Sequence, residues 1–202
     1  MTKQNLPDKS ILAIDFGGTS LDAVFYQNST IQKKTDKSSL AYPATDDSIK
    51  NILQEWSIKP DHLDIIAVTG GKSEFLAKDT TYRLTHIPEI QAIGLGGLYL
   101  ADKPQALVVS LGTGTAMVAS TKEKHQHMGG TGLGGGTILG LGKLLCLEDD
   151  FPNLEFLAQN GNIKNVDLLV EDIVGQAIGI IPADLTASNF GKISLTESSH
   201  YQ

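Results

Sequence analysis

The strongest constraint on the fold is a pattern that occurs twice, at residues 11–26 and again at residues 106–120. In each copy an almost continuous apolar segment leads into a turn rich in glycine and threonine, and a second apolar segment follows. A nearly unbroken apolar run of this length is typical of a strand that is covered on both faces. The repeat therefore predicts two β-hairpins in two related halves of an α/β fold.

The rest of the chain alternates between apolar strand-like segments and helical patterns. We expect strands at residues 11–15, 21–26, 31–34, 63–69, 106–110 and 116–120, and helices at residues 48–56, 73–77, 89–100, 153–160 and 166–177, with one more helix ending at Cys146. Asp46 or Asp47 is expected near the first helix cap. The predicted organisation is a flexible tail (1–10), a first half (11–104) and a second half (105–202), with loop and tail after residue 183.

Three glycines fall inside the predicted helix at residues 89–100. Gly94, Gly96 and Gly97 would each cost the helix roughly 1 kcal/mol relative to alanine. We therefore expect close packing of this helix against another backbone.

Charge and composition exclude several classes of protein. The net charge is −7 without a block of like charges, which argues against nucleic-acid binding through bulk electrostatics. No apolar stretch approaches the ~20 residues of a membrane span, and the polar N-terminus lacks the apolar region of a signal peptide. We expect a cytoplasmic protein with no membrane contact, in which Cys146, the single cysteine, is a buried small apolar residue.

The first glycine turn has the composition of a phosphate-binding loop. Gly17 and Gly18 would let backbone N–H groups approach a polyphosphate, and the Thr19 hydroxyl adds a donor. Asp15, at the end of the strand, can hold Mg²⁺ through water, because Mg²⁺ gives up its hydration shell reluctantly. Taken alone, the motif is equally compatible with an ordinary hairpin turn.

Two further glycine segments extend this interpretation to ATP. The second turn repeats the chemistry with Gly112, Thr113, Gly114 and Thr115. A third segment, 129–137, runs into a helix, where Gly134, Gly135 and Gly136 could present N–H groups to an anion. A flexible linker is the alternative, but its flanks are apolar. The chain has no Gly-Lys-Ser/Thr sequence of a Walker A loop, and its first loop enters a strand, unlike a Rossmann loop.

Taken together, these motifs resemble the type II pantothenate kinases, in matching order from about residue 11 to residue 191. The resemblance is carried by residues 15–19, 69–71, 112–115, 129–136 and 182–191. It implies an actin-like (ribonuclease H-like) duplicated fold and a homodimer. It also implies transfer of the ATP γ-phosphate to the hydroxyl of pantothenate, the first step of coenzyme A synthesis.

The resemblance also assigns roles to single residues. Asp15 would lie near Mg²⁺, and Gly17, Gly18 and Thr19 would contact phosphates. Glu89 falls where the family has its general base, although a helix N-terminal acid favoured by the dipole is the alternative reading. Thr113 would line the substrate side of the second loop.

The chain departs from the family pattern at three places. Asp22 stands where the family usually has a lysine, and His127 aligns with an arginine that holds substrate or phosphate. Histidine is mostly neutral at pH 7 and lacks the bidentate guanidinium fork. The chain also stops where family members continue, so the second half is expected to be incomplete.

Three functions are compatible with these residues. The first is an ATP- and Mg²⁺-dependent pantothenate kinase with Glu89 as base. The second, favoured by Asp22 and His127, is a weak or inactive relative that binds nucleotide or acyl-CoA. The third is a sugar-type kinase of the same fold, although such kinases generally place an aspartate base on a different loop.

Overall fold

The computed structural model describes residues 9–38, 41–76 and 80–195. The predictions made for residues 1–8, for Ala77 and for residues 196–202 lie outside the described residues. The chain forms two compact units, Met1–Leu141 and Gly142–Gln202. The predicted division into halves at residue 104 stays a prediction.

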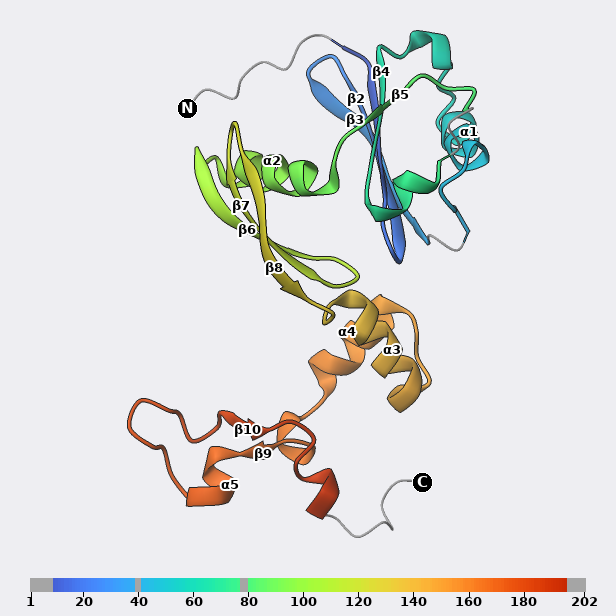
Figure 1. Ribbon diagram of the computed structural model, residues 1–202. Helices are drawn as coiled ribbons and strands as arrows, with labels where there is room; N and C mark the ends of the chain where they lie inside the picture. Colours follow the sequence, from blue (N-terminus) through green and yellow to red (C-terminus); the bar gives the residue numbers. More distant parts are fainter. Residues whose placement is uncertain (1–8, 39–40, 77–79, 196–202) are drawn as a thin grey trace. The chain divides into compact units, whose positions relative to one another are not determined.

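The first sheet has five strands in the order β3-β2-β1-β4-β5 (Figure 1). Its members are β1 (Ile11–Phe16), β2 (Ser20–Gln27), β3 (Thr30–Ser38), β4 (Ile65–Thr69) and β5 (Leu84–His86). The first three strands pair antiparallel, whereas β1, β4 and β5 run parallel. The first predicted hairpin is therefore present, and β3 is longer than the sequence indicated.

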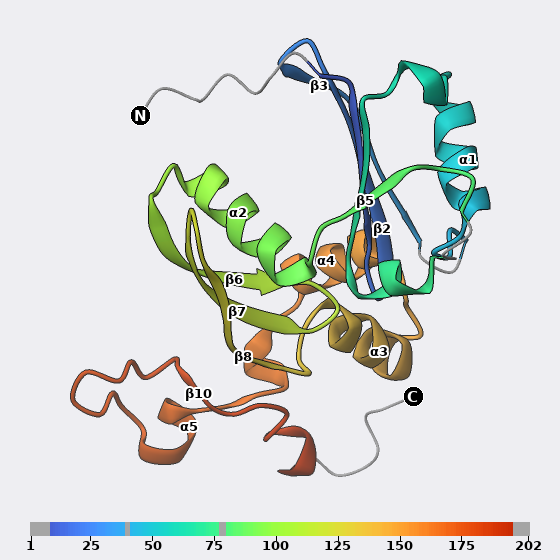
Figure 2. The ribbon, with the colours of Figure 1, turned by 45° about the horizontal axis from the view of Figure 1, so that its top comes forward.

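Helix α1 (Asp46–Glu55) covers one face of this sheet (Figure 2). Alternate residues of β1 (Leu12, Ile14 and Phe16) are almost fully buried, in one cluster with Ile49 and Ile52 of α1. Side chains alternate between the two faces of a strand, so Asp15 belongs to the opposite face. The face away from α1 is thus the one that can carry chemistry.

Helix α1 begins at Asp46 rather than at the predicted residue 48, and Asp46 and Asp47 lie near its cap as predicted. Thr45 is the N-cap, and its hydroxyl accepts a hydrogen bond from the Ser48 N–H. Asp46 and Asp47 lie in the first turn, where carboxylates interact favourably with the helix dipole.

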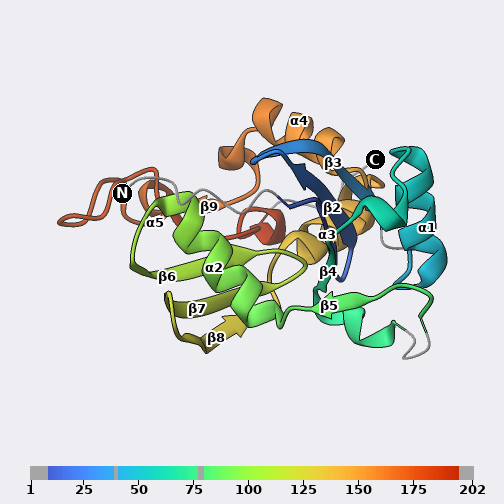
Figure 3. The same cartoon turned by 90° about the horizontal axis from the view of Figure 1, so that it is seen from above.

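The second sheet repeats the antiparallel part of the first. It has the order β6-β7-β8, formed by β6 (Gln105–Leu111), β7 (Thr115–Thr121) and β8 (His125–Thr131). Both pairs are antiparallel, as in β1-β2-β3. Helix α2 (Glu89–Ala101) lies across this sheet (Figure 3) and contacts all three strands.

The glycines of α2 allow close packing at two of the three positions, but against side chains rather than against the other backbone that the sequence predicted. A β-carbon at Gly97 would meet the Val108 side chain, and one at Gly94 would collide with the side chains of Ser120 and His125. The prediction is wrong for Gly96, because nothing lies within 4 Å of such an atom.

The second unit contains mostly short elements. Helix α3 (Gly135–Cys146) crosses the boundary between the units, and α4 (Phe151–Asn160), β9 (Leu168–Leu169), α5 (Val170–Val174) and β10 (Thr186–Ser188) follow. The 3₁₀ turns within the described residues are η1 (Pro60–His62), η2 (Gly71–Phe75), η3 (Ile163–Asn165) and η4 (Ile193–Leu195). Of the helix predicted at 166–177, only residues 170–174 are helical. In addition, β10 and η4 occupy a region predicted as loop, and Cys146 is exposed rather than buried.

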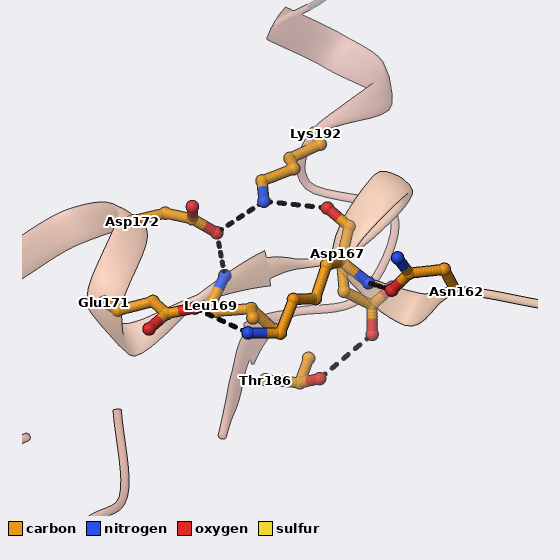
Figure 4. Close-up of polar contacts among 8 residues, drawn as sticks. Asn162, Asp167, Leu169, Glu171, Asp172, Thr186 and Lys192 are labelled. Carbon is orange, nitrogen blue, oxygen red and sulfur yellow. Dashed lines mark hydrogen bonds and ion pairs between the residues drawn. The ribbon is translucent and has the colours of Figure 1, made fainter. Parts of the chain in front are cut away.

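A buried carboxylate organises this unit and explains the error at 166–177. Asp167 accepts a hydrogen bond from the Thr186 hydroxyl at 3.0 Å (Figure 4). It also accepts one from the Phe190 N–H at 2.9 Å, so two contacts tie the segment 182–191 to this carboxylate. Beside it, the Lys192 ammonium pairs with Asp172 at 2.8 Å. Long-range polar contacts thus replace the first turns of the predicted helix.

No helix in the described ranges is long and apolar enough to cross a membrane.

Candidate active-site cleft

A cleft of about 550 Å³ lies in the first unit, where the two hairpin turns approach each other. Many of the predicted site residues line it: Asp15, Gly17, Gly18, Glu89, Gly112, Thr113, Gly114 and Thr115. The two turns belong to separate sheets, so tertiary structure has brought together residues that are far apart in the chain.

The two glycine turns touch each other directly. The hydroxyls of Thr19 and Thr113 are 3.2 Å apart and share a hydrogen bond. A β-carbon at Gly18 would lie 2.6 Å from the Thr113 hydroxyl oxygen, so only glycine allows this approach. Thr19 itself is not among the residues that line the cleft; it contacts the second loop instead.

Asp15 is an acidic residue of the cleft that has two other acidic residues near it. It lies directly opposite Asp22 across the β1–β2 hairpin, and both residues line the cleft. Burial raises the pKa of the Asp15 carboxyl, and the negative charges of Glu89 and Asp22 raise it further. A bound cation would relieve this cost, because an opposite charge nearby favours the ionised carboxylate.

Gly70 directly follows β4, and its backbone lies against the Asp15 side chain. Its backbone has φ +87° and ψ 153°, a conformation that is essentially confined to glycine. A β-carbon there would collide with Asp15 Oδ1 and lie 2.5 Å from the Phe16 carbonyl oxygen. Gly70 therefore allows the backbone after β4 to lie close against the Asp15 carboxylate, between the cleft-lining residues Thr69 and Gly71.

Glu89 is the first residue of α2 and lies next to the same loop. The preceding residue, Pro88, provides no side-chain cap. A β-carbon at Gly71 would lie 3.5 Å from Glu89 Oε2, which locates this carboxylate beside the loop that follows β4. The side chain is exposed to the cleft, so a carboxylate is available there to accept a proton.

The third glycine segment packs against the second glycine turn and forms hydrogen bonds with it. The N–H groups of Gly135 and Gly136 donate to the carbonyl oxygens of Gly112 (2.8 Å) and Thr113 (3.0 Å). A β-carbon at Gly134 would lie 2.7 Å from Gly114 Cα. The observed contacts of these glycines support the second turn, and direct phosphate contact from them stays a prediction.

His127 lies in β8, is exposed, and is not among the residues that line the cleft. His125 starts β8, and its Nδ1 atom is buried against α2. A substrate contact from His127 therefore stays a prediction.

Sequence reasoning missed one charged residue in the cleft. Lys72 follows Gly70 and Gly71 and lines the cleft, and its ammonium donates to the Gly18 carbonyl oxygen at 2.6 Å. The available signal was its position, because ligands of α/β folds bind beyond the carboxyl ends of parallel strands.

The residues of the cleft fit a hydrated Mg²⁺ rather than a metal held by protein alone. No group of three or more His, Cys, Asp or Glu side chains suited to a metal occurs in the part of the chain that the structure describes. Mg²⁺ commonly keeps several waters and takes one or two carboxylates together with substrate phosphates. Asp15 is suited to that arrangement.

Solved structures identify the class of fold. The activator of 2-hydroxyisocaproyl-CoA dehydratase from Clostridium difficile, solved with ADPNP, superposes with a TM-score of 0.55 at 13% identity, over 76% of this chain and 57% of that chain. Component A of (R)-2-hydroxyglutaryl-CoA dehydratase from Acidaminococcus fermentans has the same TM-score at 17% identity, over 76% and 60%. The chain has the actin-like ATPase fold, as its sequence predicted.

Sequence relatives narrow this class to one family. The Fumble family profile matches residues 101–202. The type II pantothenate kinase of Bacillus anthracis is 33% identical over 199 residues, which cover 95% of this chain and 69% of that protein. The chain belongs to the type II pantothenate kinase family, whose members are transferases.

Proposed function

We propose that this protein transfers the γ-phosphate of ATP to the hydroxyl of pantothenate, the first step of coenzyme A biosynthesis. Membership of the family supports the reaction. The observation that carries the proposal is the cleft, where an acidic residue at the start of α2 and two glycine turns surround one volume.

In this proposal the first turn binds phosphates and Asp15 holds Mg²⁺ through water. When bound, Mg²⁺ would neutralise charge on the phosphates. Gly112, Gly114 and Thr115 would bind phosphate from the opposite side, with Gly134, Gly135 and Gly136 behind them. Thr113 and His127 are proposed contacts of the substrate.

Glu89 is proposed as the general base. The pantothenate hydroxyl oxygen forms a bond to the γ-phosphorus, the bond from that phosphorus to the β,γ-bridging oxygen breaks, and ADP leaves with the electron pair. The hydroxyl proton passes to the Glu89 carboxylate. General-base catalysis of this kind contributes typically 10²–10⁴-fold to a rate.

The test is ADP release by the purified chain with Mg-ATP, with and without pantothenate. Glu89→Gln should lower pantothenate-dependent turnover at least about 100-fold, as expected for a lost general base, while ATP binding persists. Glu74→Gln, at an exposed position of η2, is the matched control and should have no effect. Full turnover by Glu89→Gln would exclude Glu89 as the base.

A catalytically weak relative that binds nucleotide or acyl-CoA is the second candidate, favoured by one observation. Asp22 adds negative charge directly opposite Asp15, where polyphosphate charge has to be accommodated. Nucleotide or acyl-CoA binding without pantothenate-dependent ADP release would support this candidate.

A cytoplasmic homodimer is also proposed, on the family resemblance alone. Light scattering of the purified chain tests the dimer, and a mass equal to one chain would contradict it.

A further inference from the structure

The charge of the cleft poses a problem for any polyphosphate. Asp15, Asp22 and Glu89 line it, whereas Lys72 is the one lysine or arginine among its lining residues in the described part of the chain. Anionic phosphates would therefore meet a predominantly acidic surface. One divalent cation would offset part of this charge, but the protein itself has to supply further positive charge close to the phosphates.

Lys72 lies at the position where that charge is needed. Its ammonium donates to the carbonyl oxygen of Gly18, a residue of the first phosphate-binding turn, at 2.6 Å. The neighbouring Gly71, which also lines the cleft, lies beside the Glu89 carboxylate. The loop after β4 therefore joins the phosphate-binding turn to the proposed base.

The backbone holds Lys72 in this position. Gly70, with its glycine-only conformation, redirects the chain from β4 into η2, and Lys72 follows in the first turn of η2. The Lys72 side chain is half-buried, so part of its conformational entropy has already been lost in the folded state. A cation ordered in this way needs little further ordering when an anion binds.

We propose that Lys72 is the phosphate-binding cation of this cleft, with the β-phosphate of a nucleoside diphosphate or triphosphate as its ligand. This inference rests on the proposed use of ATP at the same site. It adds a residue from the loop after β4 to the two glycine turns. It also predicts that the protein tolerates Asp22 because Lys72 offsets part of the acidic charge.

The test compares two ligands that differ only in phosphates. Calorimetry on the full chain measures the affinities of Mg-ADP and of adenosine for the wild type, Lys72→Met and the control Lys50→Met, an exposed residue of α1. Lys72→Met should weaken Mg-ADP binding by about 10- to 100-fold, the loss expected for a charge-assisted hydrogen bond, and leave adenosine binding unchanged. Lys72→Arg, which keeps the charge, should retain most of the affinity for Mg-ADP.

A purely structural role for Lys72 would produce a different result. If the lysine only ties two loops together, Lys72→Met would weaken ADP and adenosine binding equally, and that result overturns the proposal. Unchanged Mg-ADP affinity overturns it as well. Should Lys72→Met fail to fold, as judged by thermal unfolding, Lys72→Gln replaces it in the same comparison.

The outcomes for this inference and for the proposed function are distinguishable. In one outcome, Lys72→Met loses affinity for Mg-ADP alone while the wild type transfers no phosphate to pantothenate. That combination would support the phosphate-binding role of Lys72 and refute the proposed kinase activity. Equal affinity of the wild type for adenosine and for Mg-ADP would refute both the proposed phosphate site and the proposed role of Lys72 in it.

Discussion

The backbone of Gly70 allows a quantitative test of how the cleft is built. In Gly70→Ala, the new β-carbon would collide with Asp15 Oδ1 and approach the Phe16 carbonyl oxygen to 2.5 Å. Holding a non-glycine residue in this region of φ and ψ costs about 1–3 kcal/mol. Overpacking adds about 1–3 kcal/mol, and the reduced entropy of the unfolded chain returns about 0.4–1 kcal/mol. The expected net loss is about 1–6 kcal/mol.

Urea unfolding of the full chain measures this loss. The midpoint should fall without a change in the dependence on urea. The melting temperature should fall by roughly 2–24 °C, since about 2–4 °C is expected per kcal/mol at this size. Gly96→Ala is the matched control. This glycine lies inside α2 with nothing within 4 Å of a β-carbon, so alanine should stabilise the protein by about 1 kcal/mol.

Two results would refute this reasoning. A loss below about 1 kcal/mol in Gly70→Ala would mean that the loop relaxes freely, so that the position does not require glycine. A similar loss in Gly96→Ala would mean that the calculation does not distinguish a crowded glycine from an open one.

Two further predictions concern the electrostatics and the second turn. Burial and the negative charges of Glu89 and Asp22 raise the pKa of Asp15, so the folded state favours the protonated carboxyl. Protonated Asp15 therefore contributes to the free energy of unfolding at low pH, and this contribution is lost as the pH rises from 3.8 through the raised pKa. In the proposed site the ionised Asp15 carboxylate holds Mg²⁺, so the affinity for Mg-nucleotide should decline with falling pH. Asp22→Asn should move that decline to lower pH in a calorimetric pH series. Gly134→Ala should destabilise the protein by about 1–3 kcal/mol by colliding with Gly114 Cα, whereas Gly132→Ala, with nothing within 4 Å, should show no such collision cost in urea unfolding.

The sequence predicted correctly those strands and helices whose own residues show a clear apolar pattern. The two hairpins were predictable because apolar runs end in glycine turns, and α2 because its apolar spacing outweighs its glycines. Strand β8 was missed because its sequence, His-Gln-His-Met-Gly-Gly-Thr, has neither an apolar run nor a regular alternation. It is a strand because it pairs with β7, which is a non-local interaction.

The same distinction applies to the site. Asp15 and the glycines and threonines of the two turns were predicted together because their motifs are contiguous in sequence, whereas Glu89 was assigned by the family resemblance. The contact from Lys72 to Gly18 joins two separate loops, and no local pattern reports a contact between residues 54 positions apart. The hydrogen bonds from Gly135 and Gly136 to the second turn were equally inaccessible, because they depend on how two glycine segments fold onto each other.

The hydroxyl pair formed by Thr19 and Thr113 has a consequence for ligand exchange. It links the two turns at the cleft through an exposed hydrogen bond in which either oxygen can be the donor. Such a bond contributes about 0.5–1.5 kcal/mol net, between one and three times the thermal energy. This hydrogen bond can therefore break by thermal fluctuation alone, so it is compatible with repeated binding of ATP and release of ADP.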